Sequence, residues 1–109
     1  MKLLIQKGRV LDPSSNFDEV ADVLIESGTI ARIGGNISAP EDALIIDARG
    51  CLVLPGLIDM HVHFREPGRE DQETIIGGST VAAKSGFTSV CTMPNTNPVI
   101  DNQALVRFI

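Results

Sequence analysis

The sequence predicts an α/β fold in two parts, a strand-rich first half and a second half in which strands and helices alternate. Short apolar runs separated by glycine, proline and serine clusters indicate strands over residues 1–54. After Pro55-Gly56, a largely apolar run, a helical stretch, a second strand and a second helix follow in that order. Such an order is typical of parallel strands joined by crossover helices.

The first half is expected to form a small β-sandwich, because its strands are short and regularly spaced. Ser27-Gly28 predicts a tight hairpin between strands at residues 21–26 and 29–33. Lys7-Gly8-Arg9 predicts a turn that would divide the first apolar run into two short strands. The remaining strands are expected at residues 3–6, 10–11, 43–47 and 51–54.

The second half contains two glycines inside an expected helix and a capping residue before another. Gly77-Gly78 each cost about 1 kcal/mol in a helix interior, so they predict a close approach of this helix to a sheet. Asp101 or Asn102 is the expected N-cap of the last helix. The expected elements are strands at residues 57–61 and 88–93, and helices at residues 73–85 and 104–109.

Charge and hydropathy exclude several classes of function. The net charge is −5 and no stripe of lysine and arginine is present, which argues against nucleic-acid and anionic-membrane partners. No apolar run approaches the roughly 18 residues of a membrane span, and residues 1–7 are too short for a signal peptide. Cys51 and Cys91 are expected to be buried, reduced thiols. These features together predict a cytoplasmic protein.

The segment from Asp59 to Arg65 carries the strongest chemical signal. In a β-strand, alternate residues share a face, so Asp59, His61, His63 and Arg65 are expected to point the same way. Two neutral imidazoles on one face form half of a site for zinc or a similar ion. Since His61 and His63 are the 2 histidines of the chain, it cannot supply a complete histidine set alone.

The run from Pro55 to His63 resembles the signature of the amidohydrolase superfamily. His61 to Gly68, together with Met93 to Pro98, is similar to the dihydroorotases of the bacterial class I type. This resemblance implies the N-terminal part of a (β/α)8 metal-dependent hydrolase barrel preceded by a small β-sandwich. Residues 1–54 would then belong to the sandwich, and residues 55–109 to the first βαβα portion of the barrel. A barrel alone takes about 250 residues, so with a barrel plus an extra domain as the reference size the chain would be about the first quarter of such an enzyme.

The resemblance also implies roles for individual residues. His61 and His63 would bind the first of one or two zinc ions, and Asp59 would orient a ligand histidine or its loop. Arg65 and Asn95 would bind a substrate carboxylate. The enzyme would interconvert N-carbamoyl-L-aspartate and dihydroorotate in pyrimidine biosynthesis. The bridging metal ligand and the catalytic base would lie beyond Ile109, so the isolated chain is predicted to be inactive.

Each of these residues also has a structural explanation. The histidines could be a structural pair, Asp59 a turn cap and Asn95 a turn residue. Arg65 could form a salt bridge with an acidic residue of a loop that is expected to be solvated. The acidic residues of that loop are Glu66, Glu70 and Asp71.

Three other functions stay open at this stage. An allantoinase or another cyclic amidase would use the same metal chemistry on another substrate. A catalytically silent relative would act as a scaffold for a partner enzyme of pyrimidine synthesis. A stand-alone metal-binding module would bind zinc weakly with two histidines. The expected assembly is a homo-oligomer or an association with aspartate transcarbamoylase.

Overall fold

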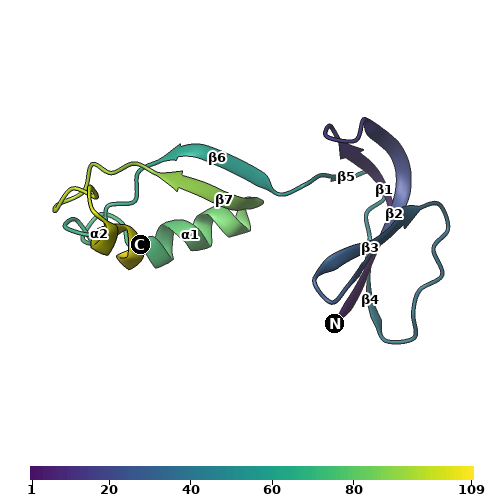
Figure 1. Cartoon of the computed structure of the whole chain (residues 1–109). Helices are drawn as coiled ribbons and strands as arrows, with labels where there is room; N and C mark the ends of the chain where they lie inside the picture. The colour runs from purple at the N-terminus through teal and green to yellow at the C-terminus, as the bar shows by residue number, and fades with distance from the viewer. The chain divides into compact units, whose positions relative to one another are not determined.

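The structure is a computed structural model that describes residues 1–109. The chain divides into two compact units, Met1–Pro55 and Gly56–Ile109, which are described separately (Figure 1). Their boundary lies one residue from the position expected from the Pro55-Gly56 pair. No helix of the structure has both the length and the apolar character needed to cross a membrane.

The first unit is one five-stranded sheet in which β1 occupies a central position. β1 pairs antiparallel with β2 and parallel with both β4 and β5, while β3 pairs antiparallel with β2. Ser27 and Gly28 both have positive φ, 51° and 79°, as in a two-residue hairpin turn, so the predicted hairpin is confirmed. The strands are β1 (Lys2–Asp12), β2 (Phe17–Glu26), β3 (Thr29–Gly34), β4 (Ala43–Asp47) and β5 (Leu52–Val53).

Two expectations for this sheet are wrong. Lys7-Gly8-Arg9 is not a turn, because β1 runs unbroken through it and the register with β2 shifts between Ile5 and Gly8. Lys7 takes a φ of 63° at this bulge. The irregularity that Gly8 indicated is therefore a bulge in a continuous strand and not a reversal of the chain. β2 also begins at Phe17 rather than at residue 21, because the polar stretch before Ala21 pairs with the far end of β1.

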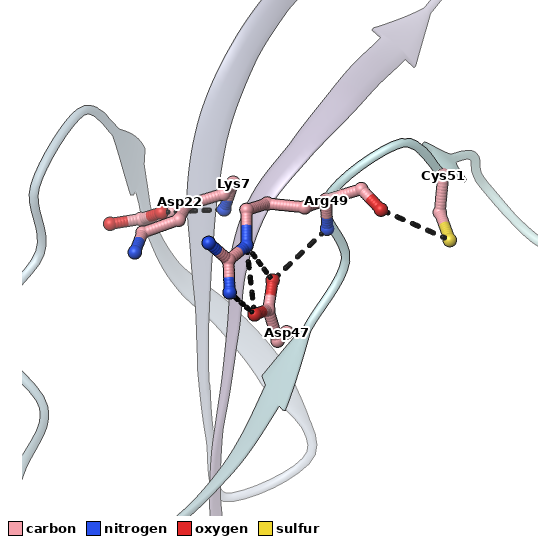
Figure 2. A network of polar contacts seen from close by, with 5 residues as sticks. All are labelled: Lys7, Asp22, Asp47, Arg49 and Cys51. Atoms are coloured by element: carbon pink, nitrogen blue, oxygen red, sulfur yellow. Dashed lines mark hydrogen bonds and ion pairs between the residues drawn. The ribbon is translucent and has the colours of Figure 1, made fainter.

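The two faces of this sheet each hold a small apolar cluster, because neighbouring residues of β2 alternate between them, and one buried carboxylate lies on the face of Leu24. The Asp22 side chain is 5% exposed and accepts the backbone N–H groups of Lys7 and Ile37 at 2.9 and 2.8 Å. Both of its oxygens are therefore satisfied, and the same carboxylate stabilises the β1 bulge. Figure 2 shows Asp22 with Lys7, together with the nearby Asp47–Arg49 ion pair. The clusters are Leu4, Leu24 and Ile37, and Val10, Ala21 and Val23.

The strand β4 leaves large apolar side chains uncovered. Leu44, Ile45 and Ile46 are 61%, 51% and 44% exposed. A sandwich needs two facing sheets, and this unit contains one. The expected two-sheet sandwich is therefore not present within this unit, which is a single sheet.

The second unit has the predicted strand–helix–strand–helix order. β6 (Leu57–Val62) and β7 (Phe87–Thr92) are parallel neighbours, and α1 (Ile75–Lys84) connects them. The helix begins two residues later than expected, because the Thr74 side chain accepts the Gly77 N–H and caps it. Asn102 caps α2 (Gln103–Phe108) by accepting the N–H groups of Ala104 and Leu105, in agreement with one of the two predicted caps. Figure 1 shows β6 and β7 side by side over α1.

The cysteines are free but exposed, so the expectation of buried thiols is wrong. The Cys91 Sγ atom lies 4.0 Å from the Met60 Sδ atom across β6 and β7. Met60 itself is 71% exposed. The strand sequence is apolar enough for a sheet buried on both faces, yet nothing in this unit covers the face that carries Met60.

Candidate functional site

The two histidine rings meet at the carboxyl end of β6. His61 lies within the strand and His63 is the first residue after it. The Nε2 atoms of the two rings are 3.1 Å apart, the ring centroids are 4.9 Å apart and the ring planes cross at 61°. Both side chains are exposed. The pair is therefore an accessible cluster of two imidazoles whose Nε2 atoms face each other.

The end of β6 that carries these rings contains a bulge. The register between β6 and β7 shifts between Asp59 and Val62, so the strand carries an extra residue there. Past this point the Met93 N–H donates to the Val62 carbonyl at 2.8 Å and fixes the strand ends side by side. His61 therefore lies within the bulged segment, and His63 lies just after it.

Asp59 supports this geometry through the backbone. Its Oδ1 atom accepts the His61 N–H at 2.9 Å, and no hydrogen bond joins the carboxylate to either ring. The side chain also lines a hollow of about 230 Å³ between the sheet and α1, together with Val62 and Phe87. This one hydrogen bond fits both readings of Asp59, as a cap of a local turn and as a support for the segment that carries the histidines.

The donor set fits half of a zinc site. Two nitrogens bound to one tetrahedral zinc at about 2.0–2.1 Å lie roughly 3.3 Å apart, and the Nε2 separation of 3.1 Å is close to that spacing. No cluster of three or more histidine, cysteine or acidic side chains is present in the structure. A complete coordination sphere would need donors that the described residues do not bring to this pair.

Asn95 contacts the histidine pair from the loop that follows β7. Its Oδ1 atom lies 2.9 Å from the His63 Nδ1 atom, across 32 residues of sequence. The sequence predicted a substrate contact for Asn95 and gave no signal for this bond with His63. The bond depends on the parallel pairing of β6 and β7, which places the ends of the two strands next to each other.

Arg65 makes no ion pair in the structure, unlike three other arginines. The acidic side chains of its loop have other partners. The Glu66 Oε2 atom accepts the Ile75 N–H at 2.8 Å, and the Glu70 Oε1 atom accepts the Gly68 N–H at 2.9 Å. Asp71 pairs with Arg69 at 3.2 Å. The partly buried Arg65 guanidinium is therefore left without a carboxylate partner.

The electrostatics of this loop follow from the same contacts. The Gly68 N–H bonded to Glu70 is the main reason that the pKa of this carboxyl is lowered. The hydrogen bond from Arg69 is the main reason that the pKa of Asp71 is lowered. Both side chains are exposed, so these bonds shape the loop more than they stabilise the fold. The Glu70 and Asp71 side chains are exposed to solvent, as expected, whereas Glu66 is partly buried.

The loop that carries Arg65 is joined to the loop that carries Asn95. The Asn97 N–H donates to the Pro67 carbonyl at 3.1 Å. Gly68, with a φ of 105°, packs so closely that a Cβ atom there would lie 2.2 Å from the Asn97 carbonyl oxygen. A side chain at position 68 would push the two loops apart. Their residues therefore occupy one connected surface.

Phe64 and Gly78 are two further residues that the sequence did not assign to the site. Phe64 follows His63 directly and is 8% exposed. A Cβ atom built on Gly78 would lie 2.3 Å from the Phe64 Cε1 atom. Helix α1 makes the predicted close approach at Gly78, but it approaches the Phe64 ring and not a sheet. Helix α1 thus holds the residue next to a candidate ligand.

Comparison with protein families gives one match in the second half of the chain. A family model described as "Dihydro-orotase-like" matches residues 50–109. A curated protein named dihydroorotase, from Pelobacter propionicus, is 55% identical over 109 residues, which is all of this chain and 26% of that protein. A dihydroorotase from Geobacter sulfurreducens is 54% identical with the same coverage. The chain thus spans about a quarter of the length of the curated relatives it matches.

Solved structures give a similar result. A D-hydantoinase (dihydropyrimidinase) from Thermus sp. is 32% identical and superposes with a TM-score of 0.70, covering 97% of this chain and 23% of that one. An L-hydantoinase from Arthrobacter aurescens is 25% identical with a TM-score of 0.77 and the same coverage. The two units of this chain thus recur in cyclic amidohydrolase structures.

Proposed function

Because this chain belongs to the dihydro-orotase-like family, we propose that it forms part of an enzyme that interconverts N-carbamoyl-L-aspartate and dihydroorotate. The name shared by its curated relatives supports this substrate pair. The observation that carries the proposal is the meeting of the His61 and His63 Nε2 atoms, 3.1 Å apart, at the carboxyl end of a parallel strand. Catalytic residues gather at that end of the strands in (β/α)8 barrels.

In this proposal, β6, α1 and β7 are the first units of a (β/α)8 barrel, and the first sheet is one layer of an adjoining β-sandwich. The enzyme would act in the cytoplasm. The parallel pairing of β6 and β7 through α1 supports the barrel assignment. The uncovered apolar side chains of β4 and β6 support it too, because both sheets would be covered in a larger domain.

His61 and His63 would bind a metal ion, which we take to be zinc. This ion would be either the single metal of the enzyme or the first of two. Lewis-acid activation of the amide carbonyl and of water near neutral pH is the chemistry that bound zinc supplies. Asp59 would fix the His61 backbone and so keep the first ligand in place. We assign no general base among these residues. Asp59 accepts the His61 N–H, and the two histidines would be metal ligands.

Substrate selection would depend on Arg65 and Asn95. Both proposed substrates carry a carboxylate, which a guanidinium binds with two parallel charge-assisted hydrogen bonds. Arg65 has no carboxylate partner within the chain, which leaves its donors available. The Asn95 Nδ2 group makes no hydrogen bond in the structure and could donate to the same carboxylate. Allantoin and simple hydantoins lack this carboxylate.

The test uses the full-length protein that contains this segment. Purified protein with zinc should convert dihydroorotate, and should lose both zinc and turnover in the His61→Ala and His63→Ala variants. Preferred turnover of allantoin or a hydantoin would favour another cyclic amidase. Absence of turnover, together with activation of an added partner enzyme of pyrimidine synthesis, would favour the silent scaffold. Zinc content unchanged in both histidine variants would contradict the ligand assignment.

A further inference from the structure

The hydrogen bond between His63 and Asn95 has a direction that the chemistry of the two groups determines. An amide oxygen can only accept, so the His63 Nδ1 atom, 2.9 Å from Asn95 Oδ1, must carry a hydrogen. In a neutral imidazole with a hydrogen on Nδ1, the Nε2 atom keeps its lone pair. That Nε2 atom is the one that faces His61 at 3.1 Å.

The opposite orientation of the amide would remove the ligand. If Asn95 were turned over, its NH2 group would donate to Nδ1, and the hydrogen of the neutral ring would move to Nε2. A metal binds the lone pair of a neutral imidazole, so His63 could then no longer bind through Nε2. The orientation with Oδ1 towards His63 is therefore the one compatible with a metal at the pair.

The geometry points to Asn95 as a positioning residue that selects the tautomer and ring orientation of His63 and so sets the metal affinity of the site. This inference rests on the proposed function and adds a second task to a residue that the proposal assigns to the substrate. One amide serves both tasks, with Oδ1 bonded to the ligand histidine and Nδ2 free for a substrate carboxylate. The loops that hold the pair are fixed by the Met93–Val62 and Asn97–Pro67 backbone bonds.

The two tasks separate in variants of the full-length protein. Asn95→Ala removes both ends of the amide, and we expect zinc affinity to fall about 10- to 100-fold in chelator competition, as for other partners of ligand histidines. Asn95→Asp keeps an oxygen acceptor for Nδ1 but brings a negative charge towards the substrate. It should retain zinc close to the native affinity while the KM for dihydroorotate rises. The absorption spectrum of the cobalt-substituted protein reports the ligand field without turnover. Of these two Asn95 variants, only Asn95→Ala should change this spectrum.

Asn97→Ala is the matched control, because Asn97 lies in the same loop, its hydrogen bond uses the backbone N–H, and alanine keeps the Cβ atom that lies near Gly68. It should leave zinc affinity and the cobalt spectrum unchanged. Native zinc affinity in Asn95→Ala, with loss of zinc in His63→Ala, would overturn the positioning role and leave the proposed function intact. Native zinc affinity in His63→Ala as well would overturn the ligand assignment and this inference together.

Discussion

Arg65 is a guanidinium that the local acidic residues do not neutralise, although the sequence offered three candidates. Glu66 binds the start of α1, Glu70 binds the backbone of Gly68 and Asp71 binds Arg69. Each of these carboxylates therefore has another partner, and Arg65 makes no ion pair. An arginine in this state can bind a ligand carboxylate without first breaking an ion pair.

Replacement of Arg65 by methionine should therefore act on the substrate. A hydrogen bond to a charged group contributes about 1.5–3 kcal/mol, so the KM for dihydroorotate should rise roughly 10- to 150-fold in the full-length protein. The kcat should change less, because in the proposed role the guanidinium would bind the carboxylate equally before and after reaction. Arg69→Met is the control, since Arg69 is already paired with Asp71. Unchanged dihydroorotate kinetics in Arg65→Met would remove the main support for the substrate.

At the scale of elements, Glu66 links the loop after β6 to the first turn of α1. Its carboxylate accepts the Ile75 N–H at 2.8 Å, one of the N–H groups that a helix leaves without an internal partner. The negative charge also lies at the favourable end of the helix dipole. Glu66 thus stabilises the helix start, and with it the loop that follows His63.

Loss of this anchor should be measurable as stability. Glu66→Ala should lower the free energy of unfolding of the full-length protein by about 1.5–3 kcal/mol, the usual range for a charged hydrogen bond. Glu66→Gln keeps the acceptor oxygen and should lose less. Asp71→Ala breaks only an exposed ion pair and should change stability by less than about 1 kcal/mol. Equal effects of the alanine variants in denaturant titration would refute the anchor.

The glycine pair in α1 offers a second comparison. Gly77→Ala and Gly78→Ala each gain about 1 kcal/mol of helix propensity, so this gain cancels when the two variants are compared. The nearest atom to a Cβ at Gly77 is the Thr74 hydroxyl at 3.1 Å, whereas a Cβ at Gly78 would lie 2.3 Å from Phe64. Overpacking typically costs about 1–3 kcal/mol, so Gly78→Ala should be the less stable variant by that amount in thermal unfolding.

A compensating change identifies the contact that causes this loss. Phe64→Leu removes the ring atoms that a Cβ at Gly78 would meet. In the Gly78→Ala background it should therefore recover part of the lost stability, and in the native background it should destabilise. Additive losses in the double variant would mean that Gly78 and Phe64 do not interact.

The features that sequence could predict are those set by local chemistry. The Ser27-Gly28 hairpin, the Asn102 cap and the alternation of strand and helix in the second unit all follow from residues within a few positions of each other. The β1 bulge was mistaken for a turn, because its extended geometry is maintained by Asp22, 15 residues away. The exposure of the cysteines depends on which sheet faces lack a cover, and no local pattern reports this.

The candidate site divides in the same way. The two histidines were predicted as a pair from their spacing, and their Nε2 atoms lie 3.1 Å apart. The bulge at this end of β6 and the contact of His63 with Asn95 depend on how β6 registers against β7. Glu66 was placed in solvent because its partner is a backbone N–H, which carries no sequence signature.

At the scale of the whole molecule, the described residues leave apolar surface without a cover in both units. Leu44 is 61% exposed on β4, and Ile58 and Met60 are 62% and 71% exposed on β6. Burial of apolar surface contributes about 25 cal/mol of favourable free energy for each Å² removed from water. Association that covers these side chains is therefore favoured. In each unit, exposed large apolar side chains on a sheet strand indicate a surface that another layer of protein would cover.

The isolated 109-residue chain should consequently bind a hydrophobic dye and form aggregates of mixed size in size-exclusion chromatography, whereas the full-length protein should bind no dye and elute as one defined species. It should also show no zinc-dependent cyclisation of N-carbamoyl-L-aspartate, because the described residues offer two histidines where a catalytic zinc takes three protein ligands. Zinc affinity of the isolated chain should be weak for the same reason. A monomeric isolated chain that binds zinc tightly and turns over substrate would show that these residues form a complete site, and the proposed dependence on a larger barrel would be wrong.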